Sequence, residues 1–422
     1  MSADLASALA HAAIAAVDPR VCTRDVLRRE AARGPWTLFA FGKAARGMTE
    51  AALEELEVSR GVVIALDAAP FAHPGIVVRR GAHPAPAADA AEHGAEIEAL
   101  ARSLGAGDRA LVLLSGGGSA MLERPVEGVT IDEIARVARA LMHAGADIAE
   151  LNAVRRCLSR LKGGGLAEAL FPAEVLVVVI SDVTAGPTSL VASGPCARPA
   201  PSPDPREVIA RRGVEGMLSP AARRAIATRA DSRPGDDVFA RVREVVAADV
   251  GTAIDGARAE AERRGLRVGI DAQRIAGEAR VSGPRFVRDA RAQCARDELD
   301  VWIAGGESTV SVRGRGRGGR NQAAALAVAN EGAPDGTFVA IATDGVDGSS
   351  DAAAVWVDED VVTRAAILGL DGHALLDDDD SHAFFEATGA RLVTGPTGTN
   401  VADVWIWIDH AQRRLRRNAT TR

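Results

Sequence analysis

Most of the side chains that could do chemistry lie in glycine-rich or polar stretches that directly follow predicted strands. These stretches are FGKAARGM (41–48), LSGGGSA (114–120), NAVRRCLSRLKGGG (152–165), ISDVTAGPTSLVASGP (180–195), AGGESTVSVRGRGRGGRNQ (304–322), TDGVDGSSDAAA (343–354) and TGPTGTN (394–400). Open α/β sheets bind ligands just beyond the carboxyl ends of their strands. We therefore look for a functional site in these stretches.

The sequence SGGGS (115–119) comes directly after a short apolar run. Glycines let the backbone approach a ligand, and successive N–H groups at the start of a following helix favour an anion. No Lys-Ser/Thr follows, as a P-loop requires, and the spacing is not GxGxxG. Ser115, Gly116, Gly117, Gly118 and Ser119 are thus predicted to bind a phosphate or a carboxylate. The alternative is a tight turn with close helix–strand packing.

Two basic features follow other strands. Lys43 stands at a predicted helix start, where a cation opposes the helix dipole, and such local conflicts often mark functional positions. The alternative is a surface lysine. The segment RGRGRGGR (313–320) offers planar donors suited to phosphate or carboxylate. RGG repeats also bind RNA, but one short stretch inside a folded context favours a small anion.

Asp182, Asp344 and Asp347 stand at predicted strand ends. One or two carboxylates there suit Mg²⁺, which is otherwise bound by phosphate oxygens and water. The alternative is a loop or helix-capping role, which is common for aspartate. His83 could orient a substrate or be an ordinary loop residue. Phosphoryl transfer needs this combination of parts: bound anions, positioned cations, a metal and a group that orients the attacking hydroxyl.

Composition excludes several other classes. A chain of 422 residues predicts two domains, and 47% hydrophobic with 25% charged residues is typical of globular proteins. A net charge of −7, 3% aromatic residues and no Tyr argue against nucleic-acid binding. The four cysteines form no CxxC pair, the N-terminus reads as a helix, and no apolar run spans a bilayer. We expect a cytoplasmic protein with a small-molecule substrate and no membrane partner.

Short apolar runs alternate with helical stretches such as 131–145 and 205–230, which is the α/β pattern. A Pro-rich loop at 195–205 precedes a domain boundary that we place at about residue 240. The acidic run DDDD (377–380) is predicted to be a solvated loop. The predicted strands are 36–42, 61–66, 76–82, 110–116, 174–182, 266–270, 300–306, 308–314, 337–345, 354–358, 390–395 and 401–409.

Taken in order, these motifs resemble those of the glycerate 2-kinase (type II glycerate kinase) family, whose C-terminal part is the MOFRL domain. The resemblance rests on FGKAARGM, GAHPAP, LLSGGGSAMLERP, LNAVRRCLSRLKGG, ISDV…VASGP, GGESTVSV…GGRNQ, TDGVDG and TGPTGTN, and covers roughly residues 5 to 410. It implies a Rossmann-like domain (1–240), a MOFRL-type α/β domain (241–422) and an active site in the cleft between them. It also implies a monomer or homodimer that phosphorylates the 2-hydroxyl of D-glycerate with ATP and Mg²⁺.

The resemblance also implies roles for residues. Lys43, Arg320 and Asp182 would be catalytic, and Asp182 and Asp344 would bind the metal. Substrate or phosphate would be bound by the SGGGS residues together with Asn152, Arg155, Lys162, Glu307 and Asn321.

The sequence departs from the family pattern at several positions. Family members usually continue ISDV with Gly-Asp, whereas this chain has Thr184-Ala185-Gly186-Pro187, which lacks the acid. Ala323 replaces an expected Glu, Cys196 an expected Thr, and Ala354 an expected Gly. These changes also fit a different hydroxy-acid acceptor or a binding protein without turnover. A hydroxypyruvate reductase, a label that family members have sometimes carried, is a further alternative, but the chain lacks the GxGxxG motif of a nicotinamide enzyme.

Overall fold

The computed structural model divides the chain into two compact α/β units, each built on a six-stranded sheet, which confirms the predicted fold class. We call Pro19–Ala247 the parallel-sheet unit, and Met1–Asp18 together with Ala248–Arg422 the mixed-sheet unit. The structure describes residues 2–83, 85–184, 186–199, 201–232, 234–332 and 334–420.

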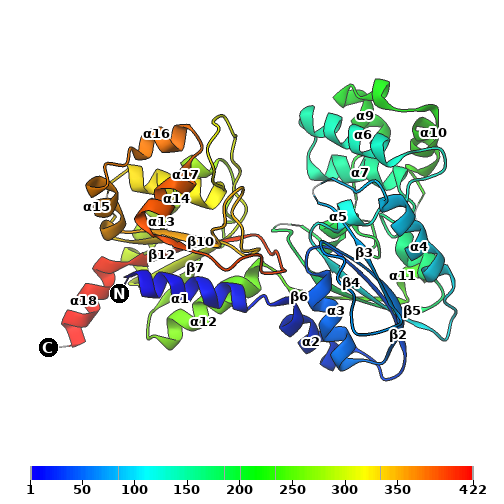
Figure 1. Ribbon diagram of the computed structural model, residues 1–422, viewed down its shortest axis with the longest axis horizontal. Coiled ribbons are helices and arrows are strands. Elements are labelled where there is room, and N and C mark those ends of the chain that lie inside the picture. Colours follow the sequence, from blue (N-terminus) through cyan, green and yellow to red (C-terminus); the bar gives the residue numbers. More distant parts are fainter. Residues whose placement is uncertain are drawn as a thin grey trace. The chain divides into compact units, whose positions relative to one another are not determined.

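The first residues of the chain belong to the mixed-sheet unit, whereas the sequence suggested one domain over residues 1–240. Helix α1 (Ser2–Ala15) packs against α12 (Val250–Arg263), and the two lie side by side along the sheet in Figure 1. Gly256 permits this close approach, because a Cβ atom there would lie 2.4 Å from Ala16 Cβ and 2.6 Å from Ala12 O. This helix pairing joins segments that are far apart in the sequence, and no local sequence pattern predicts it.

The sheet of the parallel-sheet unit has the strand order β3-β2-β1-β4-β5-β6. Strands β1 to β5 are paired in parallel. The apolar runs of β1, β4 and β5 are buried almost throughout, as in strands covered on both faces, whereas β3 at the edge is partly exposed. The strands are β1 (Trp36–Phe41), β2 (Val58–Ala65), β3 (Ile76–Arg80), β4 (Arg109–Ser115), β5 (Glu174–Ile180) and β6 (Val242–Ala248). The helices near this sheet are α2 (Pro19–Glu30), α3 (Ala45–Glu55), α4 (Ala90–Arg102), α5 (Gly118–Met121), α8 (Gly165–Leu170), η1 (Thr188–Ser193) and α11 (Asp236–Phe239).

The chain order of these strands reverses between β1 and β4. From β1 the chain builds β2 and β3 on one side, and it returns as β4 on the other. A doubly wound sheet binds ligands at such a switch point, beyond the carboxyl ends of the strands. The turns that follow β1 and β4, at residues 42–44 and 116–117, therefore lie where this topology favours a ligand.

A second apolar core in this unit holds a group of helices away from the sheet. Its helices are α6 (Ile131–His143), α7 (Ile148–Leu158), α9 (Pro205–Arg212), η2 (Glu215–Met217) and α10 (Pro220–Arg229), and they form the upper right part of Figure 1. Side-chain caps start several of them: Thr130 accepts the Glu133 N–H, and Asp147 forms a capping box with Glu150. The predicted helical stretches 131–145 and 205–230 correspond to α6 and to α9, η2 and α10, whereas α7 includes the start of the stretch 152–165, which was wrongly expected to follow a strand.

The mixed-sheet unit has the strand order β11-β10-β9-β12-β8-β7. Its strands are β7 (Val268–Ile270), β8 (Val301–Gly306), β9 (Gly336–Ala342), β10 (Ala354–Val357), β11 (Arg391–Leu392) and β12 (Asp403–Asp409). Helices α13 (Ala279–Asp297), α14 (Arg320–Asn330), α16 (Gly372–Asp377) and α17 (Ser381–Thr388) lie on one side of this sheet, and α1 and α12 on the other (Figure 1). The unit is completed by α15 (Glu359–Ile367) and α18 (His410–Thr420).

Strand β12 runs antiparallel to both β8 and β9. The register places Asp403, at the start of β12, opposite Gly306 at the end of β8 and Ala342 at the end of β9. Residues that follow β8 and β9 therefore share one edge of the sheet with the start of β12.

Two of the strand predictions were wrong. The segment 308–314 forms no strand beyond an isolated bridge at Thr309, and Gly314 at its end packs on Asp378. Strand β6 was missed, since only part of its length is buried and its apolar signal is weak.

All four cysteines are buried and free of disulfides. Among the described residues, no single helix has the length and apolar composition needed to cross a bilayer, although the bent pair Ala3–Ala15 and Pro19–Glu30 meets both criteria when taken together.

Candidate active site

The turns after β1 and β4 are bonded to each other at the switch point of the parallel sheet. Lys43 N donates to Gly116 O at 2.9 Å, and Ala44 N donates to Ser115 Oγ at 3.0 Å. Gly42 has a positive φ of +123°, and a Cβ there would lie 2.3 Å from Ser115 Oγ. The Ser115 hydroxyl, predicted to bind a ligand, is buried and instead accepts from the backbone to hold the two turns together.

Lys43 and Asp182 lie against the glycines of the turn 116–118. A Cβ atom placed on Gly116 would lie 2.2 Å from Asp182 Oδ2, and one on Gly117 would lie 3.2 Å from Lys43 Cγ and 3.1 Å from His83 Cδ2. A side chain at Gly116 would therefore displace Asp182, and one at Gly117 would be strained by the positive φ of +80°. The structure thus brings a cation and a carboxylate together at the glycine turn, while a role of these residues in binding or catalysis stays a prediction.

The helix that follows this turn is shorter than the sequence suggested. Gly117 is left-handed, with a φ of +80°, and α5 then continues for only four residues. One helical turn carries a small dipole compared with a long helix. Attraction of an anion to this turn therefore depends on its backbone N–H groups and on the neighbouring side chains.

A hydrogen-bonded network connects the glycine turn to helix α7. Ser119 Oγ lies 2.8 Å from Ser193 Oγ, which donates to Asn152 Oδ1 at 2.9 Å, and Arg155 Nη2 donates to Ser119 O at 3.0 Å. Asn152 Nδ2 and Arg155 Nε are buried donors without a partner. Burial lowers the pKa of Arg155, although Glu123 opposes this effect. Because an unpaired buried donor is costly, these two atoms fit a polar ligand or water at this corner.

Lys162 lies deeper than the sequence suggested. Its Nζ donates to Leu122 O at 3.0 Å and pairs with the Glu123 carboxylate, and both charged side chains are 0% exposed. Burial lowers the pKa of Lys162 to about 8, although Glu123 raises it. In this structure the ammonium group holds the chain around Leu122 and Glu123.

At the edge of the mixed sheet, Arg320 is held between two carboxylates. Its Nε donates to Asp403 Oδ2 at 2.5 Å, its Nη2 donates to Asp403 Oδ1 at 3.2 Å, and its Nη1 pairs with Glu307. Burial alone would lower the pKa of Arg320, but Asp403 and then Glu307 raise it above its ordinary value. Burial pushes the pKa of Asp403 upward while Arg320 pulls it down, and the two-point contact favours the ionised carboxylate.

The start of helix α14, which carries Arg320, is held by buried polar groups. The Asp347 carboxylate accepts the backbone N–H groups of Asn321 at 3.1 Å and Gln322 at 2.8 Å. Asn321 Oδ1 in turn accepts from Trp405 Nε1 at 2.8 Å. Burial raises the pKa of Asp347, and these N–H groups oppose it. Asp347 therefore caps α14, which is the second of the two roles that its position suggested.

Asp344 follows β9 and is partly exposed. Its backbone O accepts from Thr397 N at 3.1 Å, and a Cβ on Gly345 would lie 2.1 Å from Gly395 O, so the TDG and TGPTGTN loops pack tightly. Within the described ranges, no three His, Cys, Asp or Glu side chains gather as a metal-binding group. Asp182 and Asp344 each belong to a different unit. A metal would thus need oxygens from its ligand as well as a protein carboxylate.

The positions that depart from the family pattern are mostly packed inside. Cys196, Ala323 and Ala354 are buried, and burial raises the pKa of the Cys196 thiol. Ala185 lies outside the described residues, and Gly186 beside it has a φ of +113°. Cys196, Ala323 and Ala354 therefore fill space in the interior.

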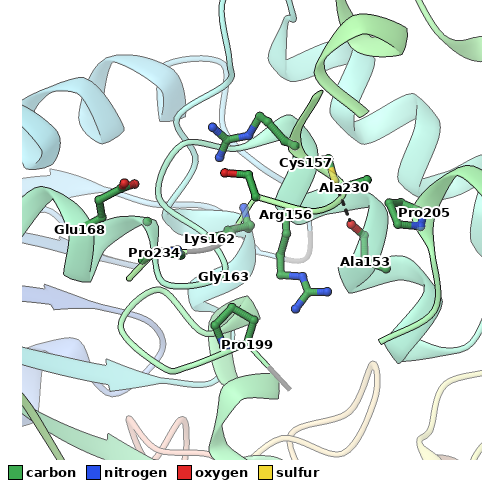
Figure 2. Close-up of a pocket in the computed structure, with 13 residues that line it drawn as sticks. Ala153, Arg156, Cys157, Lys162, Gly163, Glu168, Pro199, Pro205, Ala230 and Pro234 are labelled. Carbon is green, nitrogen blue, oxygen red and sulfur yellow. Dashed lines mark hydrogen bonds between the residues drawn. The ribbon is translucent and has the colours of Figure 1, made fainter. Parts of the chain in front are cut away.

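A separate cavity of about 60 Å³ lies in the parallel-sheet unit (Figure 2). Arg156, Cys157, Glu168 and Arg229 are among the residues that line it. Lys162 also lines this cavity, whereas Lys43, the glycine turn and Asp182 do not, so the cavity differs from the switch-point cluster.

Sequence reasoning missed three residues that hold the site. Asp403 opens a continuously apolar strand, and a lone acid in that place is its only signal. Glu123 and Ser193 lie in quoted motifs, but only the structure shows that they contact Lys162 and Asn152.

Two family models match the chain: one described as a domain of unknown function (DUF4147) at residues 5–227, and the MOFRL family at 300–403. The human protein named glycerate kinase is 34% identical over 433 residues, which cover 87% of this chain and 83% of that protein. The Thermotoga maritima D-glycerate 2-kinase is 35% identical, with 87% of this chain and 89% of that protein covered. An Agrobacterium vitis relative, 36% identical over 93% of this chain, bears the provisional name hydroxypyruvate reductase.

Solved structures similar to this chain include proteins from Thermotoga maritima and Pyrococcus horikoshii. The crystal structure of glycerate kinase from Thermotoga maritima has a TM-score of 0.87 and 33% identity, and covers 96% of this chain and 99% of that one. A protein from Pyrococcus horikoshii has a TM-score of 0.81 and 28% identity, with 96% and 98% covered.

Proposed function

This chain belongs to the glycerate kinase family, and from that premise we propose that it transfers the γ-phosphoryl group of ATP to the 2-hydroxyl of D-glycerate. The products are 2-phosphoglycerate and ADP. The observation that supports the proposal is the switch-point cluster, in which Lys43 and Asp182 lie against the glycine turn 116–118. That arrangement suits phosphoryl transfer, which depends on positioning and charge stabilisation more than on covalent chemistry.

In the proposed reaction, the 2-hydroxyl oxygen forms a bond to the γ-phosphorus while the bond from that phosphorus to the bridging oxygen breaks. ADP leaves with the electron pair of the broken bond, and the Asp182 carboxylate accepts the hydroxyl proton. Lys43 and Arg320 stabilise the charge on the transferring group. The carboxylates of Asp403 and Glu307 fix the Arg320 guanidinium beforehand, so little reorganisation is needed during the transfer.

Asn152 and Arg155 bind the carboxylate of glycerate in this account. Each presents a buried donor without a protein partner, and their positions are fixed through Ser193 and Ser119. A carboxylate accepts several such donors, and charge-assisted bonds to Arg are stronger than neutral ones. Lys162 acts from behind this corner by holding Glu123.

Mg²⁺ fits the chemistry of the donors near the glycine turn. A single carboxylate with phosphate oxygens and water is a common Mg²⁺ environment, and Asp182 offers that carboxylate. When bound, the ion would neutralise charge on the phosphates. Asp344 is proposed as a second carboxylate for the metal of the nucleotide.

The test is ADP release from Mg-ATP by the purified protein, first with D-glycerate and then with a panel of other 2-hydroxy acids. Turnover on D-glycerate is expected, and it would mean that the loop at 184–187 is tolerated without its usual acid. Activity on another acid alone would replace the acceptor in the proposal. ATP binding without turnover on the whole panel, or NADH oxidation with hydroxypyruvate, would overturn it.

A further inference from the structure

Residues 313–319, which we call the arginine loop, alternate arginine and glycine and have two different sides. One side packs on residues 378–381. A Cβ atom on Gly314 would lie 2.1 Å from Asp378 O, one on Gly316 would lie 2.3 Å from Asp380 Cβ, and one on Gly318 would lie 2.2 Å from Ser381 Oγ. Each of these positions therefore admits only glycine.

The acidic residues on that side bind the loop backbone. Their carboxylates accept N–H groups as follows: Asp379 Oδ2 from Arg313 at 2.6 Å and Gly314 at 2.7 Å, Asp378 Oδ1 from Arg315 at 3.1 Å, and Asp380 Oδ1 from Arg317 at 3.1 Å. The DDDD run is thus more than the solvated loop that its composition suggested. It fixes the path of the arginine loop, because its carboxylates accept hydrogen bonds from the backbone of that loop.

The arginine side chains on the loop are exposed. Arg313, Arg315 and Arg317 are all in the exposed class, whereas the glycines between them are partly buried. Within the part of the chain that the structure describes, none of these three guanidinium groups forms an ion pair. Arg280, by contrast, pairs with Asp379. The loop therefore presents three exposed guanidinium groups outside these ion pairs, on a backbone that Asp378, Asp379 and Asp380 already hold in place.

We propose that Arg313, Arg315 and Arg317 bind the polyphosphate chain of the nucleotide, an inference that rests on the proposed kinase function. A triphosphate carries several negative charges on one short chain, which three adjacent guanidinium groups can match. The carboxylate of glycerate carries only one. The loop leads through Gly319 directly into Arg320, so it adjoins the residue assigned to the transferring group. A backbone fixed in advance lowers the ordering cost of binding.

The experiment replaces the three arginines together, as R313Q/R315Q/R317Q, in the full chain. The matched control is R285Q/R288Q/R291Q on α13, which removes the same charge from other exposed arginines of the same unit. For the loop variant we expect the KM for ATP to rise about tenfold or more, with kcat and the KM for the acceptor changed less than about threefold. The control should keep the KM for ATP of the wild type.

Inorganic tripolyphosphate gives a second readout that does not need turnover. It should displace ATP from the wild type and the control, and it should bind the loop variant about tenfold more weakly. Equal tripolyphosphate binding and an equal KM for ATP in wild type and loop variant would overturn the inference. If the loop variant loses a binding to single-stranded RNA that the wild type has, and keeps the nucleotide affinity of the wild type, the inference is also overturned.

This second readout separates two kinds of failure. If the wild type does not phosphorylate any acceptor but still binds tripolyphosphate through the loop, the proposed function fails and the anion site stands. If the wild type is active and the loop variant keeps its ATP affinity, the site fails and the proposed function stands. Thermal unfolding of both variants checks that the exposed substitutions leave the fold intact.

Discussion

The two units place charge at a sheet edge by different means. At the switch point of the parallel sheet, glycines leave space that Lys43 and Asp182 fill, and most contacts run through the backbone. At the edge of the mixed sheet, Arg320 is fixed by Asp403 and Glu307. Catalytic activity should therefore be most sensitive to added side-chain volume in the first cluster and to lost charge in the second. This difference yields a graded set of predictions.

The largest effect is expected from the two cations. Lys43→Ala and Arg320→Ala should each lower kcat by about 10²-fold or more, because each removes charge stabilisation of the transferring group. Steady-state kinetics with saturating ATP and acceptor measure this. Near-normal turnover in one variant would show that this residue has no role in the mechanism. Near-normal turnover in both would contradict the proposed active site.

Added volume at the switch point should come next. In Gly116→Ala the new methyl meets the Asp182 carboxylate, so kcat should fall about tenfold to 10²-fold through displacement of that group. Gly107→Ala is the matched control, since a Cβ there meets nothing within 4 Å. If the two alanine variants have equal activity, the contact between the glycine turn and Asp182 has no catalytic role.

Loss of one carboxylate at the mixed-sheet edge should have a smaller effect. Asp403→Asn keeps the size of the side chain but removes the charge opposite Arg320, which then keeps only Glu307. We expect kcat to fall about tenfold while the KM for the acceptor changes little, because Arg320 loses its fixed orientation. A fall in Tm without any change in kcat would show that Asp403 serves only stability.

The smallest effect on activity is expected where a carboxylate–arginine pair belongs to the scaffold. Hydrogen bonds from Arg212 and then Arg211 lower the pKa of Glu150 to about 2, although burial opposes them. A lowered carboxyl pKa stabilises the fold above the ordinary value of 4.5, and this stabilisation is lost as the pH falls toward 2.

Glu150→Gln should therefore remove part of the acid sensitivity of unfolding between about pH 4.5 and 2, while kcat at neutral pH stays within about twofold. Denaturant unfolding of wild type and variant at a series of pH values measures the first effect. A large loss of turnover in Glu150→Gln would show that the pairing of Glu150 with Arg212 serves the active site, as the pairing of Asp403 with Arg320 is expected to do.

Local patterns predicted the fold class and the strand-end position of the main residues. Continuous apolar runs mark buried parallel strands, and Lys43, Gly116 and Asp182 directly follow three of them. The sequence could not show that Ser115 turns its hydroxyl to Ala44 or that Lys162 pairs with Glu123, since both contacts join separate segments. The same limit applies to α1, whose packing on α12 depends on Gly256.

The acidic run shows a different limit. DDDD and RGRGRGGR each have an ordinary solvated interpretation, and charge patterning alone gives no reason to connect them. Their contact runs through backbone N–H groups and glycine positions.

The central claim is that this chain phosphorylates the 2-hydroxyl of D-glycerate. The direct measurement is ³¹P NMR of the product formed from Mg-ATP and D-glycerate by the purified protein, with Lys43→Ala as the slow control and both yields compared at one early time point. The account predicts 2-phosphoglycerate and ADP in equal amounts from the wild type. Product phosphorylated at the 3-hydroxyl, or the same 2-phosphoglycerate yield from Lys43→Ala, would contradict it.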